Sequence, residues 1–426
     1  MKNLPLLLNH CSELFSLWYN KELIVRAADK IKRNYFSERH YLGSKDRKFI
    51  EMLYFDMIRN LRLYLWQINE IQPGETHNIS AELITVHAYK RLFPKESLKQ
   101  EFKVDDKIAK IFKSYNYREI LPENLAERWS LPPVLWEHIK DAYDPAELEQ
   151  ALSALLHSPG VHIRTNTLKT TTPELMEKLK EIPFQLGTLS PDALRLGTYV
   201  NLTQNPLYKN GLFDFQDESS QLVAFVCNPK KSDIIVDLCA GAGGKTLHLA
   251  ALQGDMPSLI ATDKYSNRLR ELGFRAKRLG IRNIQLRPIE KIHEQYKEKI
   301  DVLLIDAPCS GSGVYGRHPD RKWEFNEERL AFYVKEQRSI LKNNAALVKP
   351  GGYLVYATCS IIPEENGKQI EHFLSTHPEF EQVSVYDELK DRGIRIPHNP
   401  SDKYLQILPH QFQSDGFFIS KLKRIK

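Results

Sequence analysis

The spacing of apolar residues divides the chain into three regions. Over residues 1–140, apolar side chains recur at three- and four-residue steps, as in SLWYNKELIVRAADKIKRNY (16–35) and SKDRKFIEMLYFDMIRNLRLYLWQI (44–68). This spacing puts them on one face of a helix and predicts amphipathic helices, with Ser44 as an N-cap. No cluster of catalytic residue types accompanies the pattern. We therefore expect a helical domain over 1–140 that packs or docks and performs no chemistry.

The pattern changes between residues 141 and 230. GVHIRTNTLKTTTPELMEKLKEI (160–182) predicts a short strand, a threonine-rich helix start and a helix. Short apolar runs broken by proline and glycine follow, and YKNGLFDFQDESSQLVAFVCNP (208–229) ends the region with a further helix. Such runs are typical of a small α+β domain, with NPKKSD (228–233) as its link to the next region.

From Asp233 onward, short apolar runs alternate with helical patterns. The predicted strands are DIIVDLC (233–239), SLIATD (258–263), NIQLR (283–287), DVLLIDAP (301–308) and GYLVYATCS (352–360). The predicted helices between them are KTLHLAALQ (245–253), NRLRELGFRAKRLG (267–280) and ERLAFYVKEQRSILKNNAALV (328–348). This alternation predicts an α/β domain over 231–426 whose parallel sheet is covered on both faces. FEQVSVYD (380–387) and GFFISKLKR (416–424) are expected to close the sheet as late strands.

In such a sheet, ligands bind beyond the carboxyl ends of the strands. Five residues with chemically useful side chains fall there: Asp237, Asp263, Asp306, Cys309 and Cys359. The two cysteines each follow a buried strand. The sequence therefore predicts a functional site at this edge.

Length, net charge and cysteine content limit the binding partners and the cellular compartment that we expect. The length of 426 residues suggests about three domains. The net charge of +6 fits a nucleic-acid partner without requiring one. The five cysteines are an odd number without a CxxC spacing, which argues against a disulfide framework and against a zinc site, so no metal is expected. Without a signal peptide or an apolar run of about 20 residues, we expect a cytoplasmic protein without a membrane span.

The glycine-rich stretch DLCAGAGGKT (237–246) follows the first strand of the sheet and opens a helix, so its backbone can approach a ligand closely. A P-loop of an ATPase requires a glycine where Cys239 stands, although Gly244, Lys245 and Thr246 fit that motif. A dinucleotide-binding G-x-G-x-x-G is not formed either. S-adenosylmethionine is the interpretation that we favour, and a P-loop ATPase stays open as the alternative.

Asp263 ends the second strand, about 20 residues after the glycines. A carboxylate at this place can accept hydrogen bonds from both ribose hydroxyls of an adenosine cofactor. The alternative is an acid that merely starts the turn into the next helix.

A cysteine beside a methyl donor suggests covalent activation of a pyrimidine. Addition of a thiolate to carbon 6 makes carbon 5 nucleophilic, which splits one difficult step into easier ones. The adduct needs protonation or hydrogen bonding at ring nitrogen 3, and Asp306, three residues before Cys309, is the candidate for this contact. The alternative for either cysteine is a small buried apolar residue.

These motifs together resemble a known family. GLFDFQDESSQLVA, DLCAGAGGKT, DAPCSGSG, RHPDRKW, YATCSIIPEEN and DGFFISKLKR are similar, in the same order, to the motifs of Sun-type (RsmB-like) RNA 5-methylcytosine methyltransferases. YLGSKDRKFIEMLYFDMIRNLR resembles the NusB-like RNA-binding domain of bacterial members, and VHIRTNTLKTTTPEL their small intervening domain.

The resemblance implies a Rossmann-like class I S-adenosylmethionine-dependent methyltransferase sheet, preceded by an all-helical and a small α+β domain. It implies that Cys359 is the nucleophile, that Cys309 assists release and that Asp306 contacts the base. The cofactor contacts that it implies are Cys239, Ala240, Gly241, Ala242, Gly243, Gly244, Lys245, Asp263, Arg268 and Asp306.

Two positions depart from the family pattern. Gly241 and Ala242 stand where Ala-Pro is usual, and Gly316 stands where an arginine is common. By analogy, the NusB-like domain points to small-subunit ribosomal RNA as the substrate, with tRNA as the alternative. A target base in folded RNA must be unpaired or flipped out for its carbon 6 to be reached.

Overall fold

The computed structural model describes residues 3–19, 27–71, 79–94, 120–196 and 202–426. The chain forms two compact units. The helical unit comprises 1–157 together with 315–327, and the sheet unit comprises 158–314 together with 328–426. The domain boundaries expected at residues 140 and 230 stay predictions.

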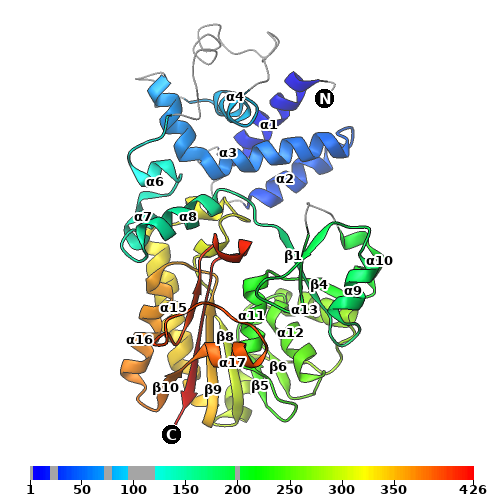
Figure 1. The fold of residues 1–426 in the computed structure, drawn as a ribbon, viewed down its shortest axis with the longest axis vertical. Helices are drawn as coiled ribbons and strands as arrows, with labels where there is room; N and C mark the ends of the chain where they lie inside the picture. Colours follow the sequence, from blue (N-terminus) through cyan, green and yellow to red (C-terminus); the bar gives the residue numbers. More distant parts are fainter. Residues whose placement is uncertain (1–2, 20–26, 72–78, 95–119, 197–201) are drawn as a thin grey trace. The chain divides into compact units, whose positions relative to one another are not determined.

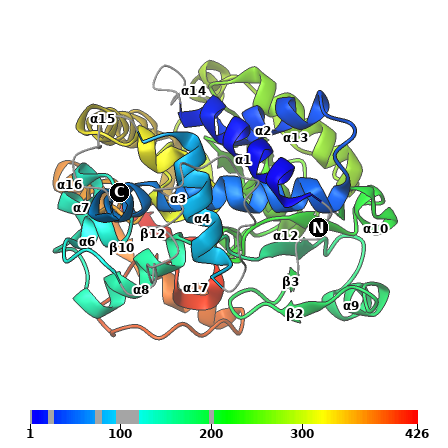
Figure 2. The same ribbon diagram turned by 90° about the horizontal axis from the view of Figure 1, so that it is seen from above.

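The helical unit is built from amphipathic helices, as the apolar spacing predicts. The longer ones are α1 (Leu4–Tyr19), α2 (Ala28–Ser37), α3 (Ser44–Ile71) and α4 (Ala81–Leu92). They are followed by α6 (Leu125–Arg128), α7 (Pro133–Ile139) and α8 (Pro145–Leu155). Helices α1, α3 and α4 lie against one another (Figure 2). Their buried apolar side chains form one cluster with those of α2. The helical pattern over 16–35 corresponds to the end of α1 and to α2, and its residues 20–26 lie outside the described part of the chain.

A segment that is distant in the sequence belongs to this helical unit. Residues 315–327, which contain the RHPDRKW motif and the 3-10 turn η4 (Arg321–Glu324), pack against α3. The guanidinium group of Arg59 donates to the carbonyl oxygen of Gly316 at 3.0 Å, and the indole of Trp323 donates to the carbonyl oxygen of Ile58 at 2.8 Å. The ammonium group of Lys322, 3% exposed, donates to the carbonyl oxygen of Arg59. Burial lowers the pKa of Lys322 well below its ordinary value.

The sheet unit begins with a small antiparallel sheet of order β2-β3-β1-β4. Its strands are β1 (Val161–Thr165), β2 (Phe184–Leu186), β3 (Ala193–Leu196) and β4 (Phe213–Phe215). Helix α9 (Thr172–Lys178) starts at a capping box in which Thr171 and Glu174 bond each other's backbone N–H groups, as the threonine-rich helix start predicts. The short helix α10 (Pro206–Lys209) precedes β4, and α11 (Glu218–Cys227) leads out of this sheet.

The large sheet has the strand order β10-β12-β9-β8-β5-β6-β7, and β11 pairs with β12. Its parallel strands are β5 (Ile235–Asp237), β6 (Leu259–Ala261), β7 (Gln285–Leu286), β8 (Ile300–Asp306) and β9 (Val348–Thr358). The late strands β10 (Phe380–Val383), β11 (Leu405–Ile407) and β12 (Phe417–Arg424) are antiparallel to their partners. The order reverses between β5 and β8, which is where ligands bind in such sheets.

Helices cover both faces of the large sheet, as Figure 1 shows. Side chains of β5 alternate between two apolar cores: Ile235 packs with α11 and α12 (Gly244–Gln253), whereas Val236 packs on the opposite face. The first face also receives α13 (Ser266–Leu279) and α17 (Val385–Asp391). The second face receives α14 (Ile289–Tyr296), α15 (Glu327–Asn344) and α16 (Gly367–Thr376). The predicted α/β class and Rossmann-like sheet are confirmed.

One late strand is shorter than predicted. In FEQVSVYD, strand β10 ends at Val383, and Ser384 caps α17 by accepting the N–H of Tyr386. The side chain of Val385 is fully buried in the helix and not in a strand. The serine decides the outcome because its side-chain oxygen satisfies a free N–H at a helix start.

Among the described helices, none has the length and apolarity that a membrane crossing requires.

Candidate active site at the carboxyl ends of the strands

The glycine loop, residues 238–243, connects β5 to α12. Asp237, the last residue of β5, is 1% exposed, and its Oδ2 atom accepts a 2.6 Å hydrogen bond from the hydroxyl of Thr246. Its Oδ1 atom has no hydrogen-bond partner among the described residues. Burial raises the pKa of Asp237 to about 7.

Two glycines of this loop have conformations that other residues adopt with strain. Gly241 has φ +55° and Gly243 has φ +92°. A Cβ atom on Gly243 would lie 2.5 Å from the Cγ atom of Leu272, so this glycine also permits the close approach of α13. A Cβ atom on Gly244 would meet no atom of the described chain within 4 Å. The space beside the Cα atom of Gly244, the first residue of α12, is therefore open.

Asp263 links the second strand to the glycine loop. Its Oδ2 atom accepts the N–H of Gly241 at 2.9 Å, and its Oδ1 atom accepts the N–H of Tyr265 at 2.8 Å. Both interpretations of this acid thus have a basis, because it starts the turn into α13 and also faces the loop. Each carboxylate oxygen has a second lone pair for another donor. Arg268 lies 3.8 Å from Asp263 and is 54% exposed.

The other loop residues are held by backbone contacts. Ala240 donates its N–H to the carbonyl oxygen of Thr262 at 2.9 Å, and the carbonyl oxygen of Ala242 accepts a 2.7 Å bond from Arg275. Burial raises the pKa of Cys239 far above its ordinary value, so this thiol stays protonated at neutral pH.

Lys245 and Asp306, both expected to contact ligands, form an ion pair with each other. Their Nζ and Oδ2 atoms lie 2.7 Å apart, between the first turn of α12 and the end of β8. Nζ also lies 5.0 Å from the ring centroid of Phe417 on β12. Burial alone would lower the pKa of Lys245, but the Asp306 carboxylate raises it above its ordinary value. The pairing fixes both side chains between the start of α12 and the end of β8.

The two cysteines expected at the strand ends lie against each other. Strands β8 and β9 are parallel neighbours with Asp306 opposite Ala357. The two strands therefore end at nearly the same position along the sheet. The Sγ atoms of Cys309 and Cys359 are 3.5 Å apart. The hydrogen bond with Cys359, together with burial, raises the pKa of Cys309 well above its ordinary value. We call these two residues the thiol pair.

Sequence reasoning missed two residues that bond the loops of the thiol pair. Glu365 and Asn366 follow Cys359 within the quoted YATCSIIPEEN motif, and both are buried. Glu365 accepts hydrogen bonds from Ser310 and Ser360, and Asn366 accepts one from Thr358. The signal in the sequence was two polar residues immediately after an apolar strand and turn.

The FDFQDES motif is a structural element in the described chain. Asp214, 3% exposed, accepts bonds from Arg275 at 2.7 Å and from Arg278 at 2.6 Å, which ties the small sheet to α13. Glu218 accepts the N–H of Ser190 at 2.8 Å, and Asp217 caps α11. The motif therefore holds α13 against the small sheet and starts α11.

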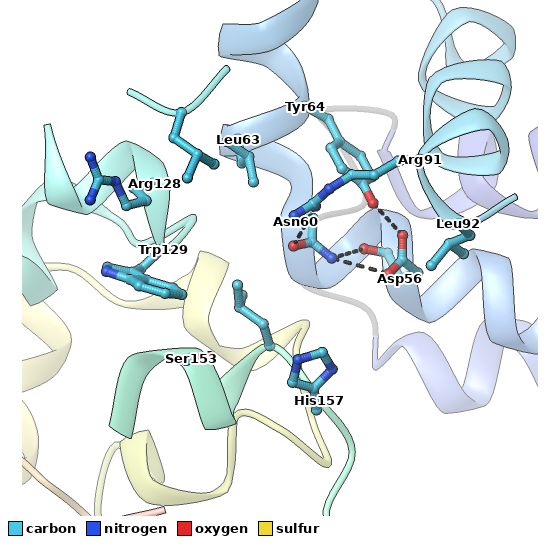
Figure 3. A pocket seen from close by; sticks show the side chains of 12 residues that line it. Asp56, Asn60, Leu63, Tyr64, Arg91, Leu92, Arg128, Trp129, Ser153 and His157 are labelled. Carbon is cyan, nitrogen blue, oxygen red and sulfur yellow. Dashed lines mark hydrogen bonds between the residues drawn. The ribbon is translucent and has the colours of Figure 1, made fainter. Parts of the chain in front are cut away.

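A separate cavity of about 440 Å³ lies within the helical unit (Figure 3). On one side, the hydroxyl of Tyr64 and the amide of Asn60 donate to Asp56. Burial raises the pKa of Asp56. On the other side lie Arg128 and Trp129 (Figure 3). A cation next to an aromatic ring suits the phosphate and base of a nucleotide.

The residues at the strand ends fit S-adenosylmethionine. The N-terminus of α12 supplies N–H groups for a carboxylate. Asp263, which accepts the N–H of Gly241, has acceptors for ribose hydroxyls. The Asp306–Lys245 pair lies at the end of β8, the strand next to β5. These donors and acceptors are the ones that an amino-acid end and an adenosine end require.

Comparisons with known proteins agree with this architecture. Residues 224–423 match the family described as 16S rRNA methyltransferase RsmB/F. A probable ribosomal RNA small subunit methyltransferase B from Synechocystis is 35% identical over 71% of this chain and 68% of its own length. The ribosomal RNA small subunit methyltransferase B of Klebsiella pneumoniae (strain 342) is 30% identical over 89% of this chain and 91% of its own length.

Solved structures show the same fold. The crystal structure of PH0851 covers 99% of both chains with a TM-score of 0.78 and 25% identity. NSun6 from Pyrococcus horikoshii, solved with SFG, has a TM-score of 0.61 and 22% identity over 69% of this chain and 98% of its own. The chain therefore belongs to the family of 16S rRNA methyltransferases RsmB/F, with S-adenosylmethionine as its cofactor.

Proposed function

We propose that this RNA methyltransferase transfers a methyl group to carbon 5 of a cytosine in the RNA of the small ribosomal subunit. The names of its relatives support the RNA class. The observation that supports the chemistry is the thiol pair, with its Sγ atoms 3.5 Å apart at the cofactor edge of the sheet.

S-adenosylmethionine supplies an electrophilic methyl group when it is bound. The thiolate of Cys359 adds to carbon 6 of the cytosine, which makes carbon 5 nucleophilic enough to take the methyl group. As Cys359 adds, ring nitrogen 3 takes up a proton from solvent, and the Asp306 carboxylate accepts a hydrogen bond from it. This proton returns to solvent when Cys359 leaves. Lys245, 2.7 Å from Asp306, fixes the direction in which this carboxylate points.

Cys309 then completes the reaction by removing the proton from carbon 5. Loss of this proton forms the double bond between carbons 5 and 6, and the bond from Cys359 to carbon 6 breaks. The largest cause of the raised pKa of Cys309 is its hydrogen bond with Cys359. That bond is lost once Cys359 is bound to carbon 6, which removes the largest cause of the raised pKa, whereas burial remains. Cys309 releases its own proton to solvent before it takes the proton from carbon 5.

The helical unit is proposed to bind RNA. Exposed Lys45 and Lys48 at the start of α3 can contact phosphates, and the cavity beside Arg128 and Trp129 can take a nucleotide. The target cytosine has to leave its stack to reach the thiol pair. The proposal includes a cytoplasmic location, where ribosomal RNA is available.

A denaturing gel with substrate RNA tests the covalent route. Cys309→Ala should form the adduct, transfer the methyl group and remain attached to the RNA, giving a slowly migrating band. Cys359→Ala should give no band. The reverse pattern would exchange the two roles, and the absence of a band from both variants would refute the covalent mechanism.

The RNA class is tested by bisulfite sequencing of total RNA from cells with and without the gene. We expect one cytosine of small-subunit ribosomal RNA to lose its protection without the gene. Loss of protection in a tRNA instead would favour the tRNA alternative. The family membership decides against the P-loop ATPase alternative.

A further inference from the structure

One buried carboxylate lies where the loops of the thiol pair meet. Glu365 ends the 3-10 turn η6 (Pro363–Glu365), six residues after Cys359, and its side chain is 0% exposed. Burial raises the pKa of Glu365 above its ordinary value. Burying a carboxyl group costs free energy unless hydrogen bonds offset it, so its partners indicate its purpose.

Those partners belong to both cysteine loops. The Oε1 atom of Glu365 accepts the N–H of Ser310 at 2.8 Å and the side-chain amide of Gln337 at 3.1 Å. The Oε2 atom accepts the hydroxyls of Ser310 at 2.5 Å and of Ser360 at 2.6 Å. Ser310 directly follows Cys309, and Ser360 directly follows Cys359. One side chain therefore bonds the residue next to each sulfur.

Further hydrogen bonds strengthen the same junction. The Asn366 side chain accepts the hydroxyl of Thr358 at 2.6 Å and donates to the carbonyl oxygen of Ser360 at 2.8 Å, so it bonds both neighbours of Cys359. The N–H of Gly313 donates to the carbonyl oxygen of Cys359 at 3.0 Å. The strands end at Asp306 and Thr358, so the sheet ladder does not itself hold the sulfur-bearing residues.

The acid matches this task better than a neutral side chain does. A carboxylate is an acceptor with about four lone-pair positions, and Glu365 receives four donors. Hydrogen bonds to an ionised carboxylate are also stronger than bonds between neutral groups. A small side chain here would leave two serine hydroxyls and one backbone N–H without their acceptor.

We propose that Glu365 is a positioning residue for methyl transfer: it holds the loops of Cys309 and Cys359 together, so that the two sulfurs face the same cytosine. The role of Glu365 in the reaction rests on the proposed function. Its role in holding the two sulfurs 3.5 Å apart does not.

Steady-state kinetics measure the effect on the reaction. We expect Glu365→Ala to lower kcat about 100-fold, with KM for RNA and affinity for S-adenosylmethionine changed less than threefold, because a misplacement of about 1 Å can cost this much. Glu365→Gln should rescue part of the loss, since its amide can accept with the oxygen and donate to the serine hydroxyls. The matched controls are Glu364→Ala and Glu364→Gln. Glu364 lies on the same turn as Glu365, but its Oε1 atom accepts a 2.8 Å hydrogen bond from Lys368. Both controls should retain kcat.

A second readout does not depend on methylation. A diazene dicarboxamide reagent oxidises two thiols to a disulfide and takes up both hydrogen atoms to become a hydrazine. With the sulfurs 3.5 Å apart, the wild-type thiol pair should form this disulfide rapidly, as followed by mass spectrometry of the full chain. We expect Glu365→Ala to form it at least tenfold more slowly, and Glu364→Ala to match the wild type.

Equal disulfide rates and equal kcat for Glu365→Ala and the wild type would overturn the inference. So would a parallel loss of cofactor affinity and melting temperature in both Glu365 variants, which would indicate general destabilisation. If Glu365→Ala does not fold, Glu365→Gln and Ser310→Ala take its place, with an expected threefold or larger decrease in both rates. A changed disulfide rate without any cytosine methylation by the wild type would refute the proposed function and leave the positioning role intact.

Discussion

Removing the charge of Asp306 tests whether the ion pair with Lys245 stabilises the site. The charged atoms lie 2.7 Å apart, which at an effective dielectric constant of about 20 corresponds to an attraction of about 6 kcal/mol before desolvation. Loss of one partner of a fully buried pair costs about 3–5 kcal/mol. The side chain of Asp306 is 32% exposed, so water compensates part of this, and we expect Asp306→Asn to lower the free energy of unfolding by about 2–3 kcal/mol.

The assay is calorimetric unfolding of the ligand-free protein. A loss of this size should lower the melting temperature by about 5–10 °C. The double variant Asp306→Asn/Lys245→Met removes both charges. Its loss in free energy of unfolding should therefore be about 2 kcal/mol smaller than the sum of the losses in the two single variants.

The pH dependence gives an independent check. In the wild type, the raised pKa of Lys245 contributes stability below its unfolded-state value, and this is lost only as the pH rises through the folded-state value. In Asp306→Asn, burial lowers the pKa of Lys245, so the destabilisation is full at neutral pH and shrinks as the pH approaches 10. Two results would refute this reasoning. One is a melting temperature of Asp306→Asn equal to that of the wild type at pH 7. The other is a loss in unfolding free energy of the double variant that equals the sum of the losses in the single variants.

Three further expectations concern other parts of the chain. Asp263→Ala should weaken binding of S-adenosylmethionine by roughly 1.5–3 kcal/mol, the value of hydrogen bonds to a charged group; titration calorimetry with an unchanged affinity would show that the ribose is held elsewhere. Because burial raises the pKa of Asp237 to about 7, the contribution of this carboxyl group to stability falls as the pH rises from about 4 to 7. Asp237→Asn should thus be more stable relative to the wild type at pH 8 than at pH 5, and a constant difference in melting temperature would contradict this. Lys45→Glu/Lys48→Glu should weaken binding of folded RNA and reduce the slope of log affinity against log salt by about 1–2; an unchanged slope would place the RNA on another surface.

The predicted site was partly available from the sequence because parallel strands end at one edge. The apolar runs ending at Asp237, Asp263, Asp306 and Cys359 could be assigned to strands individually, and parallel pairing then places their ends together. The proximity of the two cysteines could be expected in this way. Their separation of 3.5 Å could not, because it depends on Glu365 and on two loops that no periodic pattern describes.

The sequence by itself determined the helical first region, the five parallel strands and the edge at which the chemistry is proposed, since apolar periodicity and the order of strands and helices are local properties. It did not determine shorter elements such as α17 (Val385–Asp391). The tertiary structure decided which side chains meet. Lys245 pairs with Asp306, 61 residues away, and residues 315–327 join the helical unit through partners such as Arg59, 257 residues from Gly316. Such pairings depend on how distant segments pack and on which buried charges and carbonyl groups then need partners, and neither is encoded in the spacing of residues along the chain.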